Sequence, residues 1–272
     1  MPGILHTRQA TDGYFLPDHM IVLTIALALT VGLTLGLLGG GGSILTVPTL
    51  VYALGVDPKA AVVMSLPIIG GAALVGAVQH WRLGHIELKS AIPFGIAAMV
   101  GAFAGARLAG GLSGRTQLLI LGVVMLVAAV SLAWPPRIRQ EEKEHGQAAR
   151  RSSLALLAVG VGVGVLTGLV GVGGGFLIVP ALVLLGGLTM THAVGTSLLV
   201  ISMNTAAAYA GHHGTEGVAW DLVLLFGAFV AVGIVIGGRL IRRVNQVVLK
   251  RAFSVLILVI ALLLIWQNQS IL

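Results

Sequence analysis

The chain has 272 residues, of which 57% are hydrophobic and 9% are charged, and its mean hydropathy is +1.03. A soluble domain carries about 25% charged residues, so the composition excludes a soluble globular protein and predicts a polytopic membrane protein. The net charge of +7 does not indicate a nucleic-acid partner, because the basic residues lie in short segments between apolar runs, and the absence of cysteine excludes disulfides and thiolate chemistry.

The apolar runs divide into two halves of the chain. The first run begins near Met20, after a polar stretch that holds Asp12 and Asp18, and we expect it to be retained rather than cleaved as a signal peptide. The second run of each half is shorter than the ~20 residues of a full span and carries a proline, Pro48 or Pro180. Each half then holds four full spans and one short helix, or its first two runs form a re-entrant hairpin. The runs are 20–38, 44–55, 60–80, 90–109 and 117–134, then 153–169, 176–187, 192–211, 219–240 and 248–266.

A glycine-rich motif occurs twice, 132 positions apart, as Gly36–Ser43 and again as Gly168–Gly175. The match continues without a gap, so that 15 of the 31 residues from 36 to 66 are identical to their counterparts. Two halves that each interrupt an apolar segment with glycines are typical of membrane transporters. The sequence therefore predicts an all-α membrane protein of two repeats, with about 8–10 transmembrane helices and glycine-broken or re-entrant helices near the start of each repeat.

A polar linker at 135–152 separates a first membrane repeat, 20–134, from a second, 153–268. Its cluster of arginines and lysines predicts a cytoplasmic position. Counting spans outward from it places Arg82 and Lys89 inside, and the 1–19 segment and both termini outside the cytoplasm. The number of crossings in each half is odd for either arrangement of the short run. The second repeat is therefore inverted relative to the first, which favours alternating access.

The two glycine breaks are the candidate substrate site. A helix that restarts after such a break has N–H groups without partners and a positive dipole end, which together bind anions. Close helix packing is the alternative explanation, and we assign to it the other spaced glycines, such as Gly32 and Gly36. The candidate binding residues in the breaks are Gly39, Gly41, Gly42, Ser43, Gly171, Gly173, Gly174 and Gly175.

Polar residues in the third run of each half extend this site. Ser65 answers to Ser197, with Thr196 beside it, although lone hydroxyls in membrane helices often bond their own backbone. Asn204 is a stronger candidate for the pathway, because an amide in hydrocarbon needs partners. Two pairs of residues at equivalent positions of the repeats are candidate gating residues, one pair of histidines and one of arginines. The histidines could instead be solvated caps at the helix ends, and the arginines could instead snorkel to the lipid headgroups. These pairs are His80 with His212 and Arg107 with Arg239.

The acidic residues indicate the charge of the substrate. All nine carboxylates lie in loops or at span ends, whereas cation pumps and many proton-coupled carriers place one within a span. The sequence therefore favours a small anionic substrate. We expect the protein to lie in the lipid bilayer and to bind no nucleic acid, and a homodimer is a candidate assembly. Neither a metal nor a cofactor is expected, because no Asp, Glu or Cys accompanies the histidines at ligand spacing.

These motifs resemble the TauE/SafE family of sulfite and organosulfonate exporters over about residues 20–268. The resemblance rests on the two glycine motifs with the prolines that follow them, on Ala193–Ser197, and on Gly217–Trp220; the counterpart at 61–65 is a weaker match. It implies movement of a small sulfur oxyanion or sulfonate across the bacterial inner membrane.

Other functions on the same scaffold are a passive anion channel and a carrier of a different small anion. An intramembrane serine hydrolase that uses Ser197 is disfavoured, because a nucleophile needs an oriented base and the sequence contains no Gly-x-Ser-x-Gly motif. We therefore expect a transporter and not an enzyme.

Overall fold

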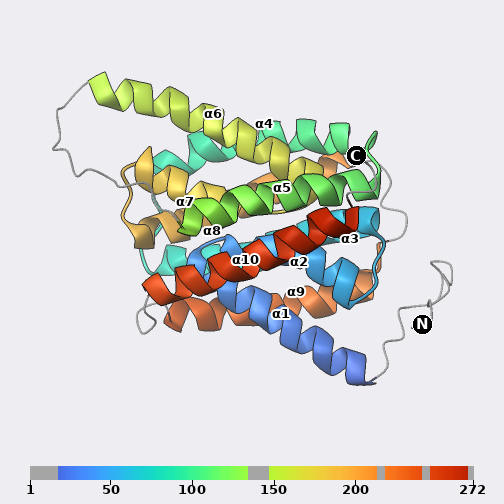
Figure 1. The fold of residues 1–272 in the computed structure, drawn as a ribbon. Helices are drawn as coiled ribbons and strands as arrows, with labels where there is room; N and C mark the ends of the chain where they lie inside the picture. The colour runs from blue at the N-terminus through green and yellow to red at the C-terminus, as the bar shows by residue number, and fades with distance from the viewer. Residues whose placement is uncertain (1–17, 134–146, 213–217, 241–245, 269–272) are drawn as a thin grey trace.

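The computed structural model describes residues 18–133, 147–212, 218–240 and 246–268, and these residues form helices joined by turns (Figure 1). The all-α prediction is confirmed, and five described helices are long and apolar enough to cross a membrane. The first repeat holds α1 (Asp18–Leu38), a short segment made of η1 (Gly41–Leu45), α2 (Thr46–Pro48) and η2 (Thr49–Ala53), then α3 (Pro58–Arg82), α4 (Leu88–Ala109) and α5 (Gly114–Ala133). The second holds α6 (Gln147–Val170), α7 (Gly175–Leu184), α8 (Met190–Gly211), α9 (Trp220–Leu240) and α10 (Gln246–Asn268).

Helix α6 begins at Gln147, within the polar stretch 135–152 that the sequence assigns to the linker, and so starts before its own apolar part. The predicted N-terminal segment and the first part of the linker lie outside the described residues.

Equivalent turns start α3 and α8. Gly55 and Gly187 both adopt left-handed backbone angles, with φ of 68° and 65°, which glycine tolerates without steric cost. Asp57 then caps α3 by accepting hydrogen bonds from the N–H groups of Lys59 and Ala60, whereas the Thr189 side chain accepts from the N–H of His192 at the start of α8. The repeat of glycine in the two halves therefore reflects a repeated turn.

The two repeats pack with a two-fold relationship. Helix α1 packs on α9 and its equivalent α6 packs on α4, while α3 packs on α8 and α5 on α10. In Figure 1, α1 begins and α10 ends on the right, whereas α5 ends and α6 begins on the left. We call these ends the terminal face and the linker face. Helix α1 starts from the terminal face and α6 from the linker face, so the repeats have opposite directions.

Glycines allow the helices of the two outer pairs, α6 with α4 and α1 with α9, to pack closely. A side chain at Gly164 or Gly168 of α6 would collide with the carbonyl oxygen of Ala98 or Ala102 of α4. In the equivalent pair, a side chain at Gly36 of α1 would lie 2.5 Å from the carbonyl oxygen of Ile234 of α9. The interpretation of these spaced glycines as packing positions is confirmed, since small residues let membrane helices approach closely.

The short segment folds back along α1. A side chain at Gly42 would lie 2.5 Å from the carbonyl oxygen of Val31, so the chain has reversed after the break. Tyr52 then lies in one cavity with Gln267 near the end of α10, and Pro58 packs against Gly114 at the start of α5. Both neighbours belong to the terminal face, so α1 and the short segment form a hairpin that begins and ends at that face. Of the two arrangements predicted for the short run, the structure has the returning hairpin.

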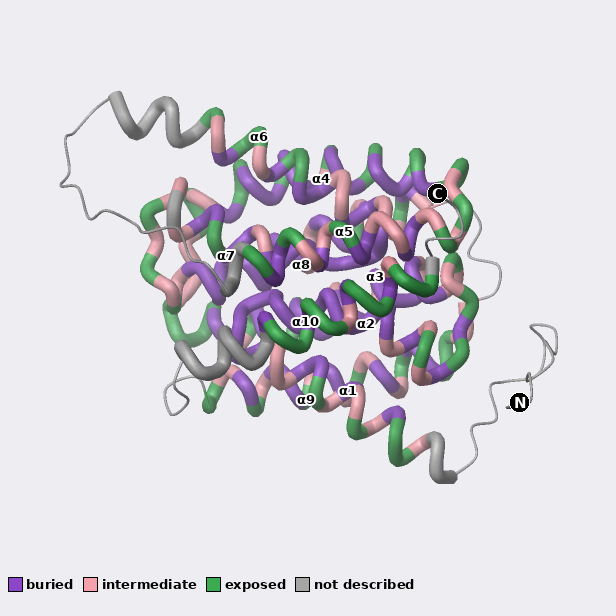
Figure 2. Tube along the Cα trace, in the orientation of Figure 1, coloured by how far each residue is buried: buried purple, intermediate pink, exposed green. Residues whose placement is uncertain are grey.

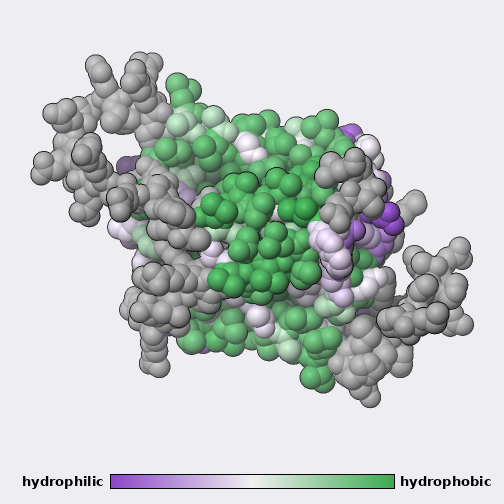
Figure 3. Space-filling model, in the orientation of Figure 1, coloured by the Kyte–Doolittle hydropathy of each residue, from purple (hydrophilic) through white to green (hydrophobic). Residues whose placement is uncertain are grey.

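Apolar side chains cover the middle of the molecule. Figure 2 shows exposed residues along the outer sides of the helices around a buried interior, and Figure 3 shows a continuous hydrophobic surface over the middle of the same view. Large apolar side chains such as Ile96, Val100 and Leu224 are more than half exposed. This surface matches hydrocarbon, so the chain is a multi-pass membrane protein.

Candidate functional site

The two glycine breaks lie in the interior between α1 and α6. Gly39 and Gly40 interrupt the first repeat with φ of 64° and 128°, and Gly171 and Gly174 interrupt the second with φ of 70° and 71°. Residues with side chains rarely adopt these angles. The backbone is therefore irregular at membrane depth, which is tolerated only where protein or a cavity surrounds it. All residues from Leu35 to Pro48 and from Val170 to Phe176 are buried.

The two breaks are in direct contact with each other. A side chain on Gly40 would collide with the Cα of Gly175, and one on Gly175 would collide with the Cα of Gly40. A side chain on Gly173 would lie 3.6 Å from the Cβ of Ser43. The candidate residues of the two repeats are therefore brought together around the two-fold axis, and the breaks are closed against each other in this conformation.

Two serines connect each break to the opposite repeat. Ser65 Oγ of α3 lies 2.6 Å from the carbonyl oxygen of Gly171, and Ser197 Oγ of α8 lies 2.6 Å from the carbonyl oxygen of Gly39. Each hydroxyl is also 2.6 or 2.8 Å from the carbonyl three residues earlier in its own helix, so its single proton is shared. We call these two contacts the serine clasps.

The serine clasps lie on opposite sides of the centre. Ser65 is the eighth residue of α3, which begins at the terminal face, and Ser197 is the eighth residue of α8, which begins at the linker face. Each serine is thus about 10 Å from the start of its helix. One clasp therefore holds the break nearer the terminal face, and the other holds the break nearer the linker face.

Helix α7 begins at the centre of the protein without a side-chain cap. Its N-cap is Gly174, which has no side chain that could accept from the first N–H groups. The start of a helix carries about half a positive charge, concentrated on such N–H groups. Helix η1 of the first repeat, after Gly40, likewise has no side-chain cap, although it is only five residues long. The stronger of the two helix ends is therefore that of α7.

Asn204 lies beside the start of α7 with one oxygen unpaired. Its side chain is fully buried, and Nδ2 donates to Thr167 Oγ1 at 3.3 Å. Oδ1 has no partner among the described residues. A side chain on Gly174 would lie 3.7 Å from Nδ2, so the amide is next to the break. A buried amide oxygen without a partner costs about 1–3 kcal/mol, which a ligand or water that donates a proton to it would recover.

Thr46 and Thr167 also lie at the breaks, although neither was predicted from the sequence as a site residue. Thr46 Oγ1 is buried and without a partner among the described residues, and Thr167 Oγ1 accepts from Asn204 while donating to the carbonyl oxygen of Val163. Both threonines belong to the apolar runs that flank the breaks, where a hydroxyl stands out from its neighbours. A polar residue within an apolar run next to a glycine break was therefore the sequence pattern that could have identified both threonines.

Thr196 and the two candidate gating histidines lie toward the ends of the helices. Thr196 Oγ1 accepts from the N–H of Glu87 at 3.0 Å, which connects α8 to the turn before α4. His212 Nε2 is 2.9 Å from the carbonyl oxygen of Gly168 at the terminal face, and burial lowers the pKa of this imidazole, an effect that the Gly168 contact opposes. His80 is buried at the linker face, so the two histidines are not close to each other.

The two candidate gating arginines are also far from each other. Arg107 and Arg239 are both exposed, near the ends of α4 and α9 at the terminal and the linker face respectively. The Arg107 guanidinium lies 5.0 Å from the centre of the Phe103 ring, where cation–π attraction holds it on an apolar neighbour. This position agrees with snorkelling toward the headgroups.

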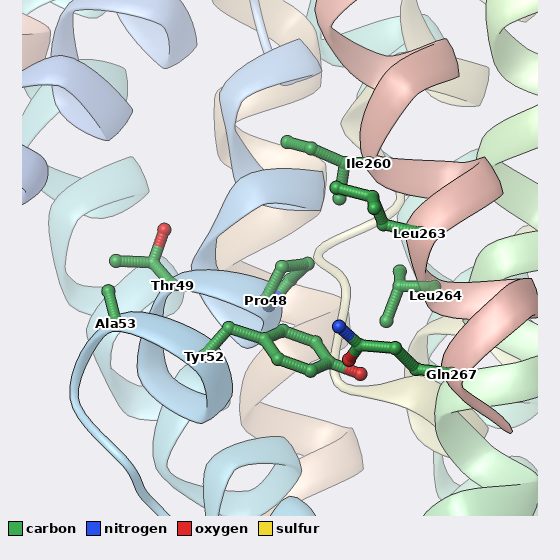
Figure 4. Close-up of a pocket in the computed structure, with 8 residues that line it drawn as sticks. All are labelled: Pro48, Thr49, Tyr52, Ala53, Ile260, Leu263, Leu264 and Gln267. Atoms are coloured by element: carbon green, nitrogen blue, oxygen red, sulfur yellow. The ribbon is translucent and has the colours of Figure 1, made fainter. Parts of the chain in front are cut away.

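A cavity of about 310 Å³ lies away from the breaks, between the short segment and α10 (Figure 4). Its lining is almost wholly apolar, and Figure 4 shows the Tyr52 ring and the Gln267 side chain pointing toward one another at one end. The cavity separates elements of the two repeats near the terminal face. Its apolar lining does not suit an anion, so we do not assign the substrate to it. The lining residues are Pro48, Thr49, Tyr52, Ala53, Ile260, Leu263, Leu264 and Gln267.

Known proteins resemble this chain along most of its length. The model of the family described as sulfite exporter TauE/SafE matches residues 24–264. A probable membrane transporter protein of Xylella fastidiosa strain Temecula1 is 32% identical over 256 residues, which cover 92% of this chain and 97% of that protein.

More distant organisms also contain relatives. The probable membrane transporter protein YdhB of Bacillus subtilis is 28% identical over 90% of this chain and 100% of its own length, and MJ0441 of Methanocaldococcus jannaschii is 23% identical over 84% and 89%. No solved structure matches the chain significantly. Since the family model covers nearly the whole chain and both repeats with their glycine breaks, the protein belongs to the TauE/SafE family of membrane transporters.

Proposed function

We propose that this protein is a secondary transporter that moves sulfite or a short organosulfonate across the bacterial inner membrane by alternating access of its two inverted repeats, in the direction of export. The anion binds where the two glycine breaks meet. The linker face is cytoplasmic, and both termini are extracytoplasmic.

The observation that carries this proposal is the uncapped start of α7 beside a buried, partly unpaired amide. Gly174 and Gly175 supply backbone N–H groups at a positive helix end, and glycine at these positions lets an oxyanion approach the backbone. Asn204 adds a polar group from α8. No carboxylate occupies the described interior, where it would repel an anion.

Asn204 favours an oxyanion that carries a proton. As placed, its Nδ2 is engaged with Thr167 and its Oδ1 is the atom without a partner. A singly protonated anion such as hydrogensulfite would donate to Oδ1 while its other oxygens accept from the N–H groups of the break. The substrate would then meet donors and an acceptor in one site, and its net charge would be only −1.

The serine clasps supply a physical basis for alternating access. Each clasp closes one break against the opposite repeat, and the two lie about 10 Å from opposite helix ends. Release of the Ser197–Gly39 clasp would open the centre toward the linker face, and release of the Ser65–Gly171 clasp would open it toward the terminal face.

The test is uptake of radiolabelled sulfite and methanesulfonate into proteoliposomes that contain the purified full chain. We expect saturable uptake that unlabelled anion on the opposite side accelerates, because a carrier returns faster when loaded. Asn204→Ala should weaken the apparent affinity about tenfold to a hundredfold, the equivalent of a charge-assisted hydrogen bond of about 1.5–3 kcal/mol.

Ser202→Ala is the matched control for Asn204→Ala. Ser202 lies on the same helix, and among the described residues its hydroxyl donates to the carbonyl oxygen of Leu199 alone, so its loss should leave uptake near the wild-type value. Absence of any protein-dependent flux of sulfur anions would overturn the proposed substrate class. If unlabelled anion on the opposite side does not accelerate the flux, the protein is a passive channel and not a carrier.

A further inference from the structure

Three histidines meet at the linker face, outside the glycine breaks. His80 lies in the last turn of α3, His85 lies in the turn that follows this helix, and His192 lies in the first turn of α8. The ring centres of His80 and His85 are 5.7 Å apart, and those of His85 and His192 are 5.8 Å apart. Sequence analysis singled out only His80 of these three. We call them the histidine cluster.

The histidine cluster contains ring nitrogens that have no hydrogen-bond partner. His80 is only 4% exposed, and Nδ1 of both His80 and His85 is buried and unpaired among the described residues. The neighbouring Gln79 likewise has a buried, unpaired Oε1. His192 differs, because its Nδ1 lies 2.9 Å from Thr189 Oγ1. Two imidazoles can therefore take up a proton on Nδ1 without breaking an existing hydrogen bond.

Metal binding does not explain the cluster. No group of three or more His, Cys, Asp or Glu among the described residues is arranged to hold a metal ion. The charged residues on the surrounding elements are Arg82 at the end of α3, Glu87 before α4, Lys89 in the first turn of α4, and Arg239 near the end of α9. The structure shows no ion pair between these side chains and the three imidazoles, within its described part. The imidazoles therefore face chiefly one another.

The histidine cluster packs against α8 within one helical turn of a serine clasp. A side chain on Gly195 would lie 2.6 Å from the carbonyl oxygen of His85 and 3.0 Å from the Cβ of His80. Two residues further along α8, Ser197 Oγ contacts the carbonyl oxygen of Gly39. A charge on the cluster therefore lies less than one turn along α8 from the serine that holds the first glycine break, on a different side of that helix.

We propose that His80, His85 and His192 form a proton-binding site whose occupancy controls the entry of the anion from the linker face. A proton from the solvent at that face binds an imidazole Nδ1, forming one N–H bond and changing no other covalent bond. The resulting positive charge attracts an anion to the adjacent clasp, and the bound anion in turn stabilises the proton.

This inference rests on the proposed anion transport, and the first experiment separates the two. Purified full-length protein in a weakly buffered detergent solution is titrated with methanesulfonate, a strong-acid anion that does not itself take up protons near neutral pH. Heat of binding reports the anion, and a pH indicator reports protons. We expect the protein to take up protons as the anion binds. Binding without proton uptake would overturn the proton site, whereas absence of binding heat with both methanesulfonate and sulfite would count against the proposed function itself.

Variants identify the residues responsible. His85→Gln, in a turn outside the span, should at least halve the protons taken up for each anion bound, and His80→Gln together with His85→Gln should abolish the uptake. If the double variant does not fold, the single variant still decides. Trp81→Phe is the matched control, because Trp81 adjoins His80 in sequence but is 56% exposed, and it should retain the full proton uptake.

Flux measurements complete the test. In proteoliposomes with the pH varied only on the linker side, methanesulfonate entry from that side should increase several-fold as the pH falls from about 8 to about 5.5. His85→Gln should flatten this profile. An unchanged profile in His85→Gln would contradict the proposal.

Discussion

Ser65 Oγ lies 2.6 Å from the carbonyl oxygen of Gly171, a residue 106 positions later in the chain. Its counterpart, Ser197 Oγ, makes the same contact with Gly39, and the two bonds tie each glycine break to the other repeat. This arrangement explains why the two repeats have serine at the same position: each serine bonds to the glycine break of the other repeat.

Removal of either clasp should lower stability. Ser65→Ala and Ser197→Ala each leave a buried glycine carbonyl oxygen without its donor, at a cost of about 1–3 kcal/mol. For a chain of this size the unfolding temperature should fall by about 2–4 °C per kcal/mol. Thermal unfolding of the purified protein in detergent measures the change. Ser202→Ala is again the control, and a melting temperature equal to that of the wild type in both clasp variants would show that the contacts contribute nothing.

Addition of a methyl group where the two breaks meet should prevent folding. In Gly175→Ala the new methyl group meets the backbone of Gly40, which cannot move without displacing the first break. We expect little folded protein, measured by size-exclusion chromatography of the detergent extract. Gly162→Ala on α6 is the matched control, because nothing lies within 4 Å of a side chain there. Equal yields of the two variants would contradict the close contact.

Gly173 offers a milder test of the same region. A side chain here meets methyl groups of Ile69 and Ile201 at 2.8 and 2.9 Å, and these side chains can rotate away. Gly173→Val should therefore insert and fold but lose anion uptake, because its bulk blocks the backbone from the substrate. Wild-type uptake by this variant would assign the glycine to packing alone.

The orientation of the protein in the membrane can be tested with single cysteines, since the native chain has none. Gly110→Cys introduces an exposed thiol between α4 and α5 at the terminal face, and Leu83→Cys introduces one at the linker face, where Leu83 is 55% exposed. A membrane-impermeant maleimide added to intact bacterial spheroplasts should label Gly110→Cys and leave Leu83→Cys unlabelled until the membrane is opened. The reverse pattern would place the linker face outside.

His212 should make the folded protein less stable in acid. Burial lowers the pKa of this imidazole in the folded state, so the unfolded chain binds the proton first as the pH falls through about 6.5. Stability is then lost as the pH decreases, and the melting temperature should fall between about pH 7.5 and about pH 5.5. His212→Gln, which can still donate to Gly168, should show a smaller fall. An equal fall in both proteins would mean that His212 does not contribute.

The fold could be predicted in outline because its causes are local or repeated. The apolar runs predicted the positions of the helices. The duplicated motif, together with an odd number of membrane crossings in each half, predicted that α1 and α6 run in opposite directions. The spaced glycines were correctly assigned to close helix packing. The path of the short segment was left open, because its length and proline suit a hairpin and an incomplete span equally; contacts with α1 and α10 decide it.

The site could be predicted only in part, because its geometry depends on contacts between distant residues. The breaks and the two serines were identified from their repetition, but the direct contact of Gly40 with Gly175 has no signal in either half alone. Arg107 and Arg239 repeat in sequence, and inversion places them at opposite faces. His85 and His192 have no counterparts in the other repeat and were therefore not predicted as partners of His80.

The central claim is that an anion binds where the breaks meet, and an electron cryomicroscopy structure of the full chain in nanodiscs with saturating sulfite tests it most directly. The account predicts density within hydrogen-bonding distance of the N–H groups of Gly174 or Gly175 and of the Asn204 amide, with both serine clasps or only one of them closed. Density for sulfite elsewhere, with the two breaks still packed against each other and Asn204 Oδ1 still unpaired, would contradict it.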